Sequence, residues 1–152
     1  MVIISKFFKV INLNQTTILL WAFIIALCAT LGSLFFSEVM HFIPCSLCWY
    51  QRIFMYPLVL ILLINLLYPD KYVYKYALPV VLVGFVISLY HNLLMFKIIP
   101  ESISPCVQGV PCSVAYINWF GFITIPLLSF MAYFAILALL ILGKKGSTKN
   151  EK

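Results

Sequence analysis

Four long apolar stretches dominate the sequence and decide what the chain can fold into. A helix needs about 20 apolar residues to cross the ~30 Å hydrocarbon layer of a bilayer. The stretches that meet this length are Thr17–Phe36, Trp49–Tyr68, Tyr76–Phe96 and Trp119–Leu142. The chain is 64% hydrophobic and only 9% charged, whereas soluble domains carry about 25% charged residues. The sequence therefore predicts an all-α membrane protein, a four-helix transmembrane bundle forming one domain over residues 1–152.

Aromatic residues and prolines add detail to these spans. Trp49, Tyr68 and Trp119 stand at span ends, where amphipathic rings anchor helices at the membrane interface. Pro57 and Pro126 fall inside two of the spans. We expect these prolines to kink their helices, which a bundle tolerates when neighbouring groups satisfy the freed backbone.

The basic residues predict the orientation of the chain, because Lys and Arg gather on the cytoplasmic side of membrane proteins. Eight lie at the chain ends or between the second and third spans: Lys6, Lys9, Lys71, Lys75, Lys144, Lys145, Lys149 and Lys152. The opposite side has only Lys97 and, just inside a helix, Arg52. Both termini are therefore expected in the cytoplasm, and segments 37–48 and 97–118 outside it.

Two other interpretations of the basic residues are disfavoured. The net charge of +6 could suggest a nucleic-acid partner. The sequence has no basic face interleaved with aromatic residues, however, so we expect no nucleic-acid partner. Lys6 and Lys9 before an apolar run resemble a secretory signal. That run is too long and lacks a small-residue cleavage site, so we expect the first span to remain in the protein.

This topology sorts the five cysteines. Cys45, Cys48, Cys106 and Cys112 all fall on the extracytoplasmic side, where disulfides can persist. Cys28 lies in the middle of the first span, and we expect it to be buried as a small apolar residue.

Four thiols in two pairs on one side admit three interpretations. A zinc site is possible because Cys-x-x-Cys spacing suits a metal, although the five residues between Cys106 and Cys112 are an unusual ligand spacing. Two inert structural disulfides could staple the outer loops. The third interpretation is a redox relay, and the surroundings of Cys45 and Cys48 favour it.

The residues around the first pair are expected to stabilise a thiolate. Pro44 suits the first turn of a helix, so Cys45 and Cys48 are predicted in the N-terminal turn of the second span, where the helix dipole favours an anion. Arg52 follows Cys48 by four residues and shares its helical face. Each of these features lowers the pKa of a thiol, and the thiolate is the reactive form.

Arg52 and His91 are candidate neighbours of a bound ligand. Arg52 could instead extend to lipid headgroups, and a membrane histidine can be a packing residue. The second and third spans run in opposite directions, however, so the two side chains are predicted at a similar depth in the outer leaflet. That coincidence favours a shared site beside the thiolate.

The second cysteine pair lies in a different setting. Pro105, Gly109 and Pro111 surround it, and these residues specify turns rather than a helix. Such a loop would expose the Cys106–Cys112 pair to a soluble protein. An exposed disulfide is the easily reduced kind.

These residues also carry a family likeness. The chain resembles the disulfide-bond formation protein B (DsbB) family, and most closely its short Gram-positive branch. The matching motifs are "LGSLFFSE", "IPCSLCWYQRIFMYPLVLIL", "GVPCS" and "YINWFGFITIP", which span about Leu31 to Leu128. Longer members of the family separate the two outer-loop cysteines by many more residues.

The resemblance implies a function, a cofactor and a partner. The family reoxidises an extracytoplasmic thioredoxin-fold oxidoreductase, soluble or membrane-anchored and of the DsbA or BdbD type, and passes the electrons to a quinone. Gram-positive kinship points to menaquinone and to a bacterial plasma membrane. By motif, Cys106 and Cys112 would meet the partner, and Cys45 and Cys48 would meet the quinone. Arg52 would lie beside the quinone head, with His91 as a polar neighbour.

We therefore predict a quinone-dependent protein-disulfide oxidoreductase. The alternative is a small non-catalytic membrane scaffold whose two disulfides only staple its outer loops.

Overall fold

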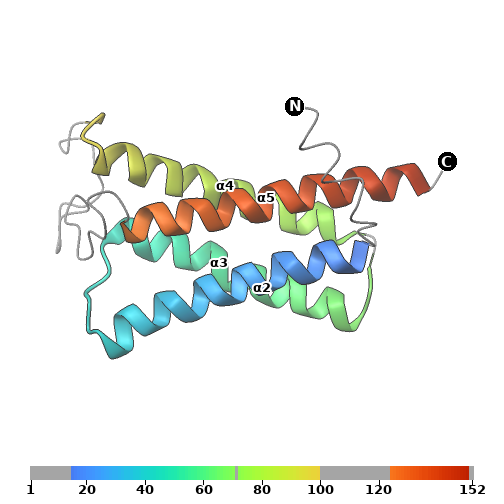
Figure 1. Cartoon of the computed structure of the whole chain (residues 1–152), viewed down its shortest axis with the longest axis horizontal. Helices are drawn as coiled ribbons and strands as arrows, with labels where there is room; N and C mark the ends of the chain where they lie inside the picture. The colour runs from blue at the N-terminus through green and yellow to red at the C-terminus, as the bar shows by residue number, and fades with distance from the viewer. Residues whose placement is uncertain (1–14, 71, 100–123, 151–152) are drawn as a thin grey trace, which may run out of the picture.

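The computed structural model describes residues 15–70, 72–99 and 124–150, with side chains described up to residue 146. Within these residues the chain forms long helices and no strand (Figure 1). The helices are α2 (Gln15–Leu34), α3 (Ser46–Leu67), α4 (Val73–Met95) and α5 (Ile125–Asn150), with the π-helical turn η1 (Phe35–Val39) after α2. Four helical segments are long and apolar enough to cross a membrane. The predicted fold class, an all-α bundle of four such helices, is confirmed.

The four helices pack as a closed ring in which each makes its most extensive contacts with two neighbours. These pairs are α2 with α3, α3 with α4, α4 with α5, and α5 with α2. Successive helices alternate in direction, so the end of α2 and the start of α3 meet the end of α4 and the start of α5 (Figure 1). This end of the bundle, which we call the site end, is where the sequence places Cys45 and Cys48. Which end faces the cytoplasm stays a prediction.

The bundle has an apolar interior and an equally apolar exterior. Leu58, Ala77 and Ile136 have no exposed surface, and they belong to one continuous core cluster. Large apolar side chains also point outward, including Leu60 at 59% and Phe134 at 54% exposed. Exposed apolar surface on this scale is unfavourable in water but suits contact with lipid.

The prolines fall at two kinds of position. Pro57 lies inside α3, as expected, and Pro79 lies inside α4. Pro126, predicted within a span, instead occupies the first turn of α5. A proline there loses no helical hydrogen bond, because the first N–H groups of a helix have no partner within it. The prediction of a kink at Pro126 was therefore wrong. The predicted start of that span at Trp119 lies outside the described residues.

Gly84 allows the close approach of α4 and α5. A Cβ at this position would lie 2.2 Å from Cε1 of Tyr133, whose side chain is fully buried. We expect Gly84→Ala to destabilise the bundle by about 1–3 kcal/mol, the usual cost of overpacking, measured as a lower unfolding temperature in detergent. Gly146→Ala is the matched control, because a Cβ there meets nothing within 4 Å. Equal stability of the two variants would contradict this packing.

Candidate redox site

Cys45 caps the N-terminus of α3 with its sulfur. Cys45 is the N-cap residue, and its Sγ accepts a hydrogen bond from the backbone N–H of Cys48 at 3.4 Å. The Pro44 ring precedes it, so the backbone is extended before the helix begins. The two sulfur atoms lie 3.0 Å apart and are hydrogen-bonded, and both cysteines are free thiols. Local helix geometry therefore places both sulfurs of the Cys-x-x-Cys pair at the site end.

The surroundings of Cys45 favour its thiolate. The hydrogen bond from the Cys48 thiol lowers the pKa of Cys45 most, and burial opposes it. His91 and the Cys48 backbone N–H lower it further, so that the pKa of the Cys45 thiol lies well below its usual range. Negative charge on a capping sulfur is also stabilised by the helix dipole. The site therefore favours the thiolate of Cys45, which is the form that thiol–disulfide exchange requires.

Alkylation of Cys45 should reflect this lowered pKa. Because the pKa of Cys45 is depressed, the thiolate is present at neutral pH and is lost only as the pH falls well below the usual range of a thiol. The rate of reaction of reduced protein with iodoacetamide, followed at Cys45 by peptide mass spectrometry, should change little between about pH 8 and pH 6, whereas an ordinary thiol with a pKa of ~8.5 would lose most of its reactivity there. A tenfold fall per pH unit in that range would contradict the thiolate assignment.

His91 lies directly beside Cys45. Its Nε2 is 3.8 Å from Cys45 Sγ, and its Nδ1 is 3.1 Å from Nε2 of Gln51. The ring is almost completely buried, at 1% exposed. The similar depth inferred from the sequence thus corresponds to a contact between α4 and the start of α3. His91 is a neighbour of the sulfur pair as well as a candidate neighbour of a ligand.

Arg52 is bound by the C-terminal end of α2. Its Nε donates to Oγ of Ser33 at 2.8 Å, and its Nη2 donates to the Ser33 carbonyl oxygen at 2.9 Å and to Oγ of Ser37. Its guanidinium also lies over the ring of Trp49, 5.5 Å from the centroid. The described partners of Arg52 are thus protein groups, and they fix its cation near a helix C-terminus, where positive charge is favoured.

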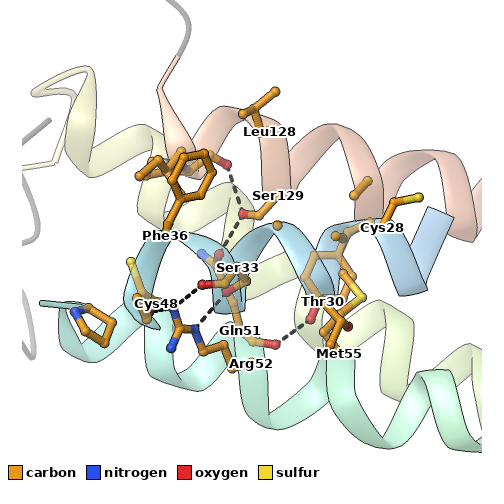
Figure 2. A pocket seen from close by; sticks show the side chains of 18 of the residues that line it. Cys28, Thr30, Ser33, Phe36, Cys48, Gln51, Arg52, Met55, Leu128 and Ser129 are labelled. Atoms are coloured by element: carbon orange, nitrogen blue, oxygen red, sulfur yellow. Dashed lines mark hydrogen bonds between the residues drawn. The ribbon is translucent and has the colours of Figure 1, made fainter. Parts of the chain in front are cut away.

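A cavity of about 480 Å³ opens beside these residues, between α2, α3 and α5 (Figure 2). Its polar lining toward the site end includes Cys45, Cys48, Ser33, Ser37, Gln51, Arg52, His91 and Ser129. Apolar residues line both the site end, among them Phe36, Phe42, Ile43 and Leu128, and the deeper part, among them Trp21, Ile24, Ile25, Met55 and Ala132. We expected a ligand between the second and third spans. The third span, α4, contributes only His91, because α2 and α5 form the remaining walls.

Cys28 also lines this cavity. It is exposed on the bundle within the apolar span Gln15–Val39, so of the two settings that we expected, burial in the bundle is wrong and burial in the bilayer stays a prediction. Figure 2 shows it on α2, deeper than Ser33. Hydropathy cannot distinguish a residue that faces the core from one that faces a cavity, since both positions are apolar.

The described residues unite four of the six predicted site residues. Cys45, Cys48, Arg52 and His91 all line the cavity, whereas Cys106 and Cys112 lie outside the described residues. Sulfur and nitrogen atoms of Cys45, Cys48 and His91 fall within 4.8 Å of one another, a spacing that could also hold a metal ion. This potential ligand set contains a histidine, unlike the four-cysteine zinc site considered from the sequence.

Several polar residues at the site were not predicted, among them Gln51 and Ser129. Gln51 and Ser129 are hydrogen-bonded to each other, and Gln51 links onward to His91. The available signal was a polar side chain inside an apolar span, where such groups are costly without partners. Gln51 follows Cys48 by three residues and lies on its helical face.

Comparisons with known proteins place the chain in a family. The family model described as "Disulfide bond formation protein DsbB" matches residues 15–143. Disulfide bond formation protein C of Bacillus subtilis (strain 168) is 52% identical over 131 residues, which cover 86% of this chain and 95% of that protein. No solved structure matches.

Two further relatives extend this result. A probable disulfide formation protein C of Halalkalibacterium halodurans is 48% identical, covering 84% of this chain and 95% of the relative. A probable disulfide formation protein of Oceanobacillus iheyensis is 42% identical, covering 91% and 97%. With these identities over nearly the whole length, and with a free Cys-x-x-Cys pair at the end of a four-helix bundle, the chain belongs to the DsbB family of disulfide bond formation proteins.

Proposed function

We propose that this chain reoxidises the dithiol of an extracytoplasmic thioredoxin-fold protein and passes the electrons to a membrane quinone. Membership of the DsbB family carries the coarser statement, that the chain is a membrane thiol-disulfide oxidoreductase of disulfide bond formation. The more specific proposal, that the electrons pass to a quinone, rests on the position of the sulfur pair. Cys45 and Cys48 line the same cavity as the Arg52 cation.

The cavity suits a quinone in size and in a lining that combines polar side chains beside the sulfur pair with apolar ones along its length. Its volume of about 480 Å³ lies within the ~300–1,000 Å³ usual for small-molecule sites. A polar ring would lie near Cys48 and Arg52, and an apolar tail would lie along α2 toward Trp21. A bound quinone supplies the acceptor for two electrons and two protons. The resemblance to the Gram-positive branch implies menaquinone.

The thiol steps balance as a sequence of exchanges. A thiolate of the reduced partner attacks Cys106 and releases Cys112, which attacks Cys45 of the Cys45–Cys48 disulfide and releases Cys48. The second partner thiol then attacks its own mixed-disulfide sulfur, leaving as oxidised partner and freeing Cys106. Cys106 attacks Cys112 and frees Cys45, so the two electrons now reside on the Cys45–Cys48 dithiol.

Protein groups around this dithiol assist its reoxidation. The helix N-terminus and His91 stabilise the Cys45 thiolate. Arg52 presents a cation fixed by Ser33 beside a largely apolar cavity, where a preorganised charge stabilises developing negative charge better than water does. These roles require both cysteine pairs on the extracytoplasmic side, the orientation that the basic residues predict.

The scaffold alternative gives no reason for this arrangement. A structural staple needs neither a nearby cation nor a buried histidine, both of which are costly to place in a membrane protein. It also needs no cavity beside the sulfur atoms. The two functions differ in one measurable respect, which is electron transfer.

The test is catalytic turnover with purified components. Full-length protein in lipid nanodiscs is mixed with a reduced DsbA-like protein and a short-chain menaquinone without oxygen. The proposal predicts one quinol for each partner disulfide formed, over many turnovers. Oxidation of the partner without quinol, or no oxidation at all, would overturn it.

Cys112→Ala should trap the partner on the protein. Cys106 of this variant has no disulfide of its own, so the protein is first treated with an aromatic disulfide reagent that leaves Cys106 in a mixed disulfide with an arylthiol. The partner thiolate attacks Cys106 and releases the arylthiol, but the thiol that should carry the electrons to Cys45 is missing. We expect turnover to be lost and a covalent complex to accumulate, visible on a non-reducing gel after mixing with a partner variant that lacks its second thiol. Normal turnover by Cys112→Ala would refute this order of exchanges.

A further inference from the structure

A chain of polar side chains, partly buried at Ser129 and buried at Gln51 and His91, runs across the bundle to Cys45. Ser129 of α5 donates from Oγ to Oε1 of Gln51 at 2.6 Å, as Figure 2 shows. Gln51 Nε2 lies 3.1 Å from His91 Nδ1, and His91 Nε2 lies 3.8 Å from Cys45 Sγ. Gln51 is 6% exposed and His91 1% exposed. Three helices therefore contribute to one connected set of hydrogen-bonding groups, and such sets persist in an apolar interior only when their members are paired.

The direction of this chain depends on the single hydroxyl proton of Ser129. Ser129 Oγ also lies 3.1 Å from the Pro126 carbonyl oxygen, but that oxygen already accepts from Nδ2 of Asn92 at 2.9 Å. The contact with Gln51 Oε1 is the shorter one, at 2.6 Å. The hydroxyl proton is therefore directed at Gln51 Oε1, and the NH₂ end of the Gln51 amide faces His91.

Gln51 itself is fixed in place by α5. Its backbone carbonyl oxygen accepts a hydrogen bond from the hydroxyl of Tyr133 at 2.7 Å. Tyr133 is fully buried and packs against Gly84 of α4. The Gln51 amide is thus supported from both its backbone and its side chain, which restricts how it can present its N–H groups.

We propose that Gln51 and Ser129 are positioning residues that fix His91 as the Nε2–H tautomer, so that His91 donates a hydrogen bond to the Cys45 thiolate. An amide N–H donating to Nδ1 requires the lone pair on that nitrogen, and the ring proton of a neutral imidazole then lies on Nε2. A donor directed at Cys45 stabilises its thiolate without transferring a proton. The effect of this hydrogen bond on the catalytic rate rests on the proposed function, whereas the tautomer of His91 can be measured without turnover.

The tautomer of His91 can be measured directly because the protein has only two histidines, His41 and His91. Full-length reduced protein labelled with ¹⁵N-histidine, treated with chelator and placed in nanodiscs, gives separate nitrogen signals for the two rings. His41→Gln assigns them. We expect His91 to show an unprotonated Nδ1 and a protonated Nε2. A ring protonated on Nδ1, or on both nitrogens, would overturn the inference.

Two substitutions of Gln51 separate positioning from general damage. Gln51→Leu removes the donor, and we expect His91 to lose its tautomer preference and the pH midpoint of Cys45 alkylation to rise by about one pH unit, the scale of one hydrogen bond to a charged group. Gln51→Glu places a carboxylate opposite Nδ1, which should move the proton onto that nitrogen. An unchanged His91 signal in both variants would overturn the proposal even if one of them folds poorly.

Ser129→Ala tests the end of the hydrogen-bonded set that lies farthest from Cys45. Without the Ser129 hydroxyl, the Gln51 amide can flip and exchange its oxygen and nitrogen ends. The His91 signal should therefore become a mixture of tautomers. Ser88→Ala is the matched control, because Ser88 is a fully buried serine whose hydroxyl donates to the Phe85 carbonyl oxygen. Its His91 signal should match that of the wild type. An unchanged signal in Ser129→Ala would contradict its positioning role.

The outcomes also separate this inference from the proposed function. If His91 shows the Nε2–H tautomer in the wild type and loses it in Gln51→Leu, but the reduced protein produces no quinol, then the inference stands and the proposed function fails. If quinol forms at the normal rate and the His91 signal does not respond to Gln51, the inference fails and the proposed function stands.

Discussion

Cys48→Ala should oxidise one equivalent of the partner and then stop. The Cys106–Cys112 disulfide remains available for a first exchange with the reduced partner. No Cys45–Cys48 disulfide can form, however, so Cys112 has no sulfur bond to attack and the electrons go no further. Steady-state turnover should fall by on the order of 10³-fold or more, the scale seen when a nucleophile is removed. The measurement is the time course of partner oxidation and of quinol formation. Partner oxidation should show an initial burst, and no quinol should form.

Cys28→Ala is the control for this experiment. Cys28 lines the same cavity but has no part in the proposed exchanges. Its replacement removes a single sulfur atom and should leave turnover within about twofold of the wild type. Continued turnover by Cys48→Ala would show that the Cys-x-x-Cys pair is not on the electron path, whatever the behaviour of Cys28→Ala.

Arg52→Ala should lose most of its quinone reduction while keeping its reaction with the partner. Removing one preorganised charged donor costs about 10²–10³ in rate. Arg52→Lys retains the charge, but one ammonium cannot reproduce the separate bonds that Nε and Nη2 make to Ser33. We expect a smaller loss for lysine, about tenfold. Steady-state assays at varied quinone concentration should show the loss in quinone reduction and a raised KM for quinone.

A matched variant separates the charge of Arg52 from its placement. Ser33→Ala removes the hydroxyl that accepts from Arg52 Nε and leaves the guanidinium charge unchanged. Its effect should be smaller than that of Arg52→Ala and should fall on the same step. A single-turnover measurement of partner exchange at Cys106 should be near the wild-type rate in all three variants. If Arg52→Ala produces quinol at the wild-type rate, Arg52 is only an anchor for the helix end.

The helices could be predicted from the sequence because hydropathy over about 20 residues reports directly on membrane crossing. The boundaries were less accessible. The third span was expected from Tyr76, whereas α4 starts at Val73, and Pro126 starts a helix that was expected to contain it. The first turn of a membrane helix and its interior are equally apolar, so hydropathy does not distinguish them. Cap geometry does, as the extended Pro44–Cys45 segment before α3 illustrates.

The reactive residues of the site could be predicted from the sequence, but the helix faces that line its cavity could not. The helix-start position of Cys45 and the shared face of Cys48 and Arg52 follow from local sequence spacing. The contact of His91 with Cys45 could be anticipated only as a similarity in depth. Gln51, Ser129 and the exposure of Cys28 depend on how the faces of α2, α3 and α5 pack, and a span that is apolar on every side does not indicate which face points inward.

The central claim is that the Cys45–Cys48 dithiol delivers its electrons to a quinone. Its most direct test is a single turnover of the isolated protein. Full-length protein carrying the reduced pair is mixed without oxygen with a short-chain menaquinone, and quinol is followed by absorbance while the disulfides are mapped by mass spectrometry. We expect one quinol and one Cys45–Cys48 disulfide per protein, with neither product in Cys48→Ala. A dithiol that remains reduced in the presence of excess menaquinone would contradict the account.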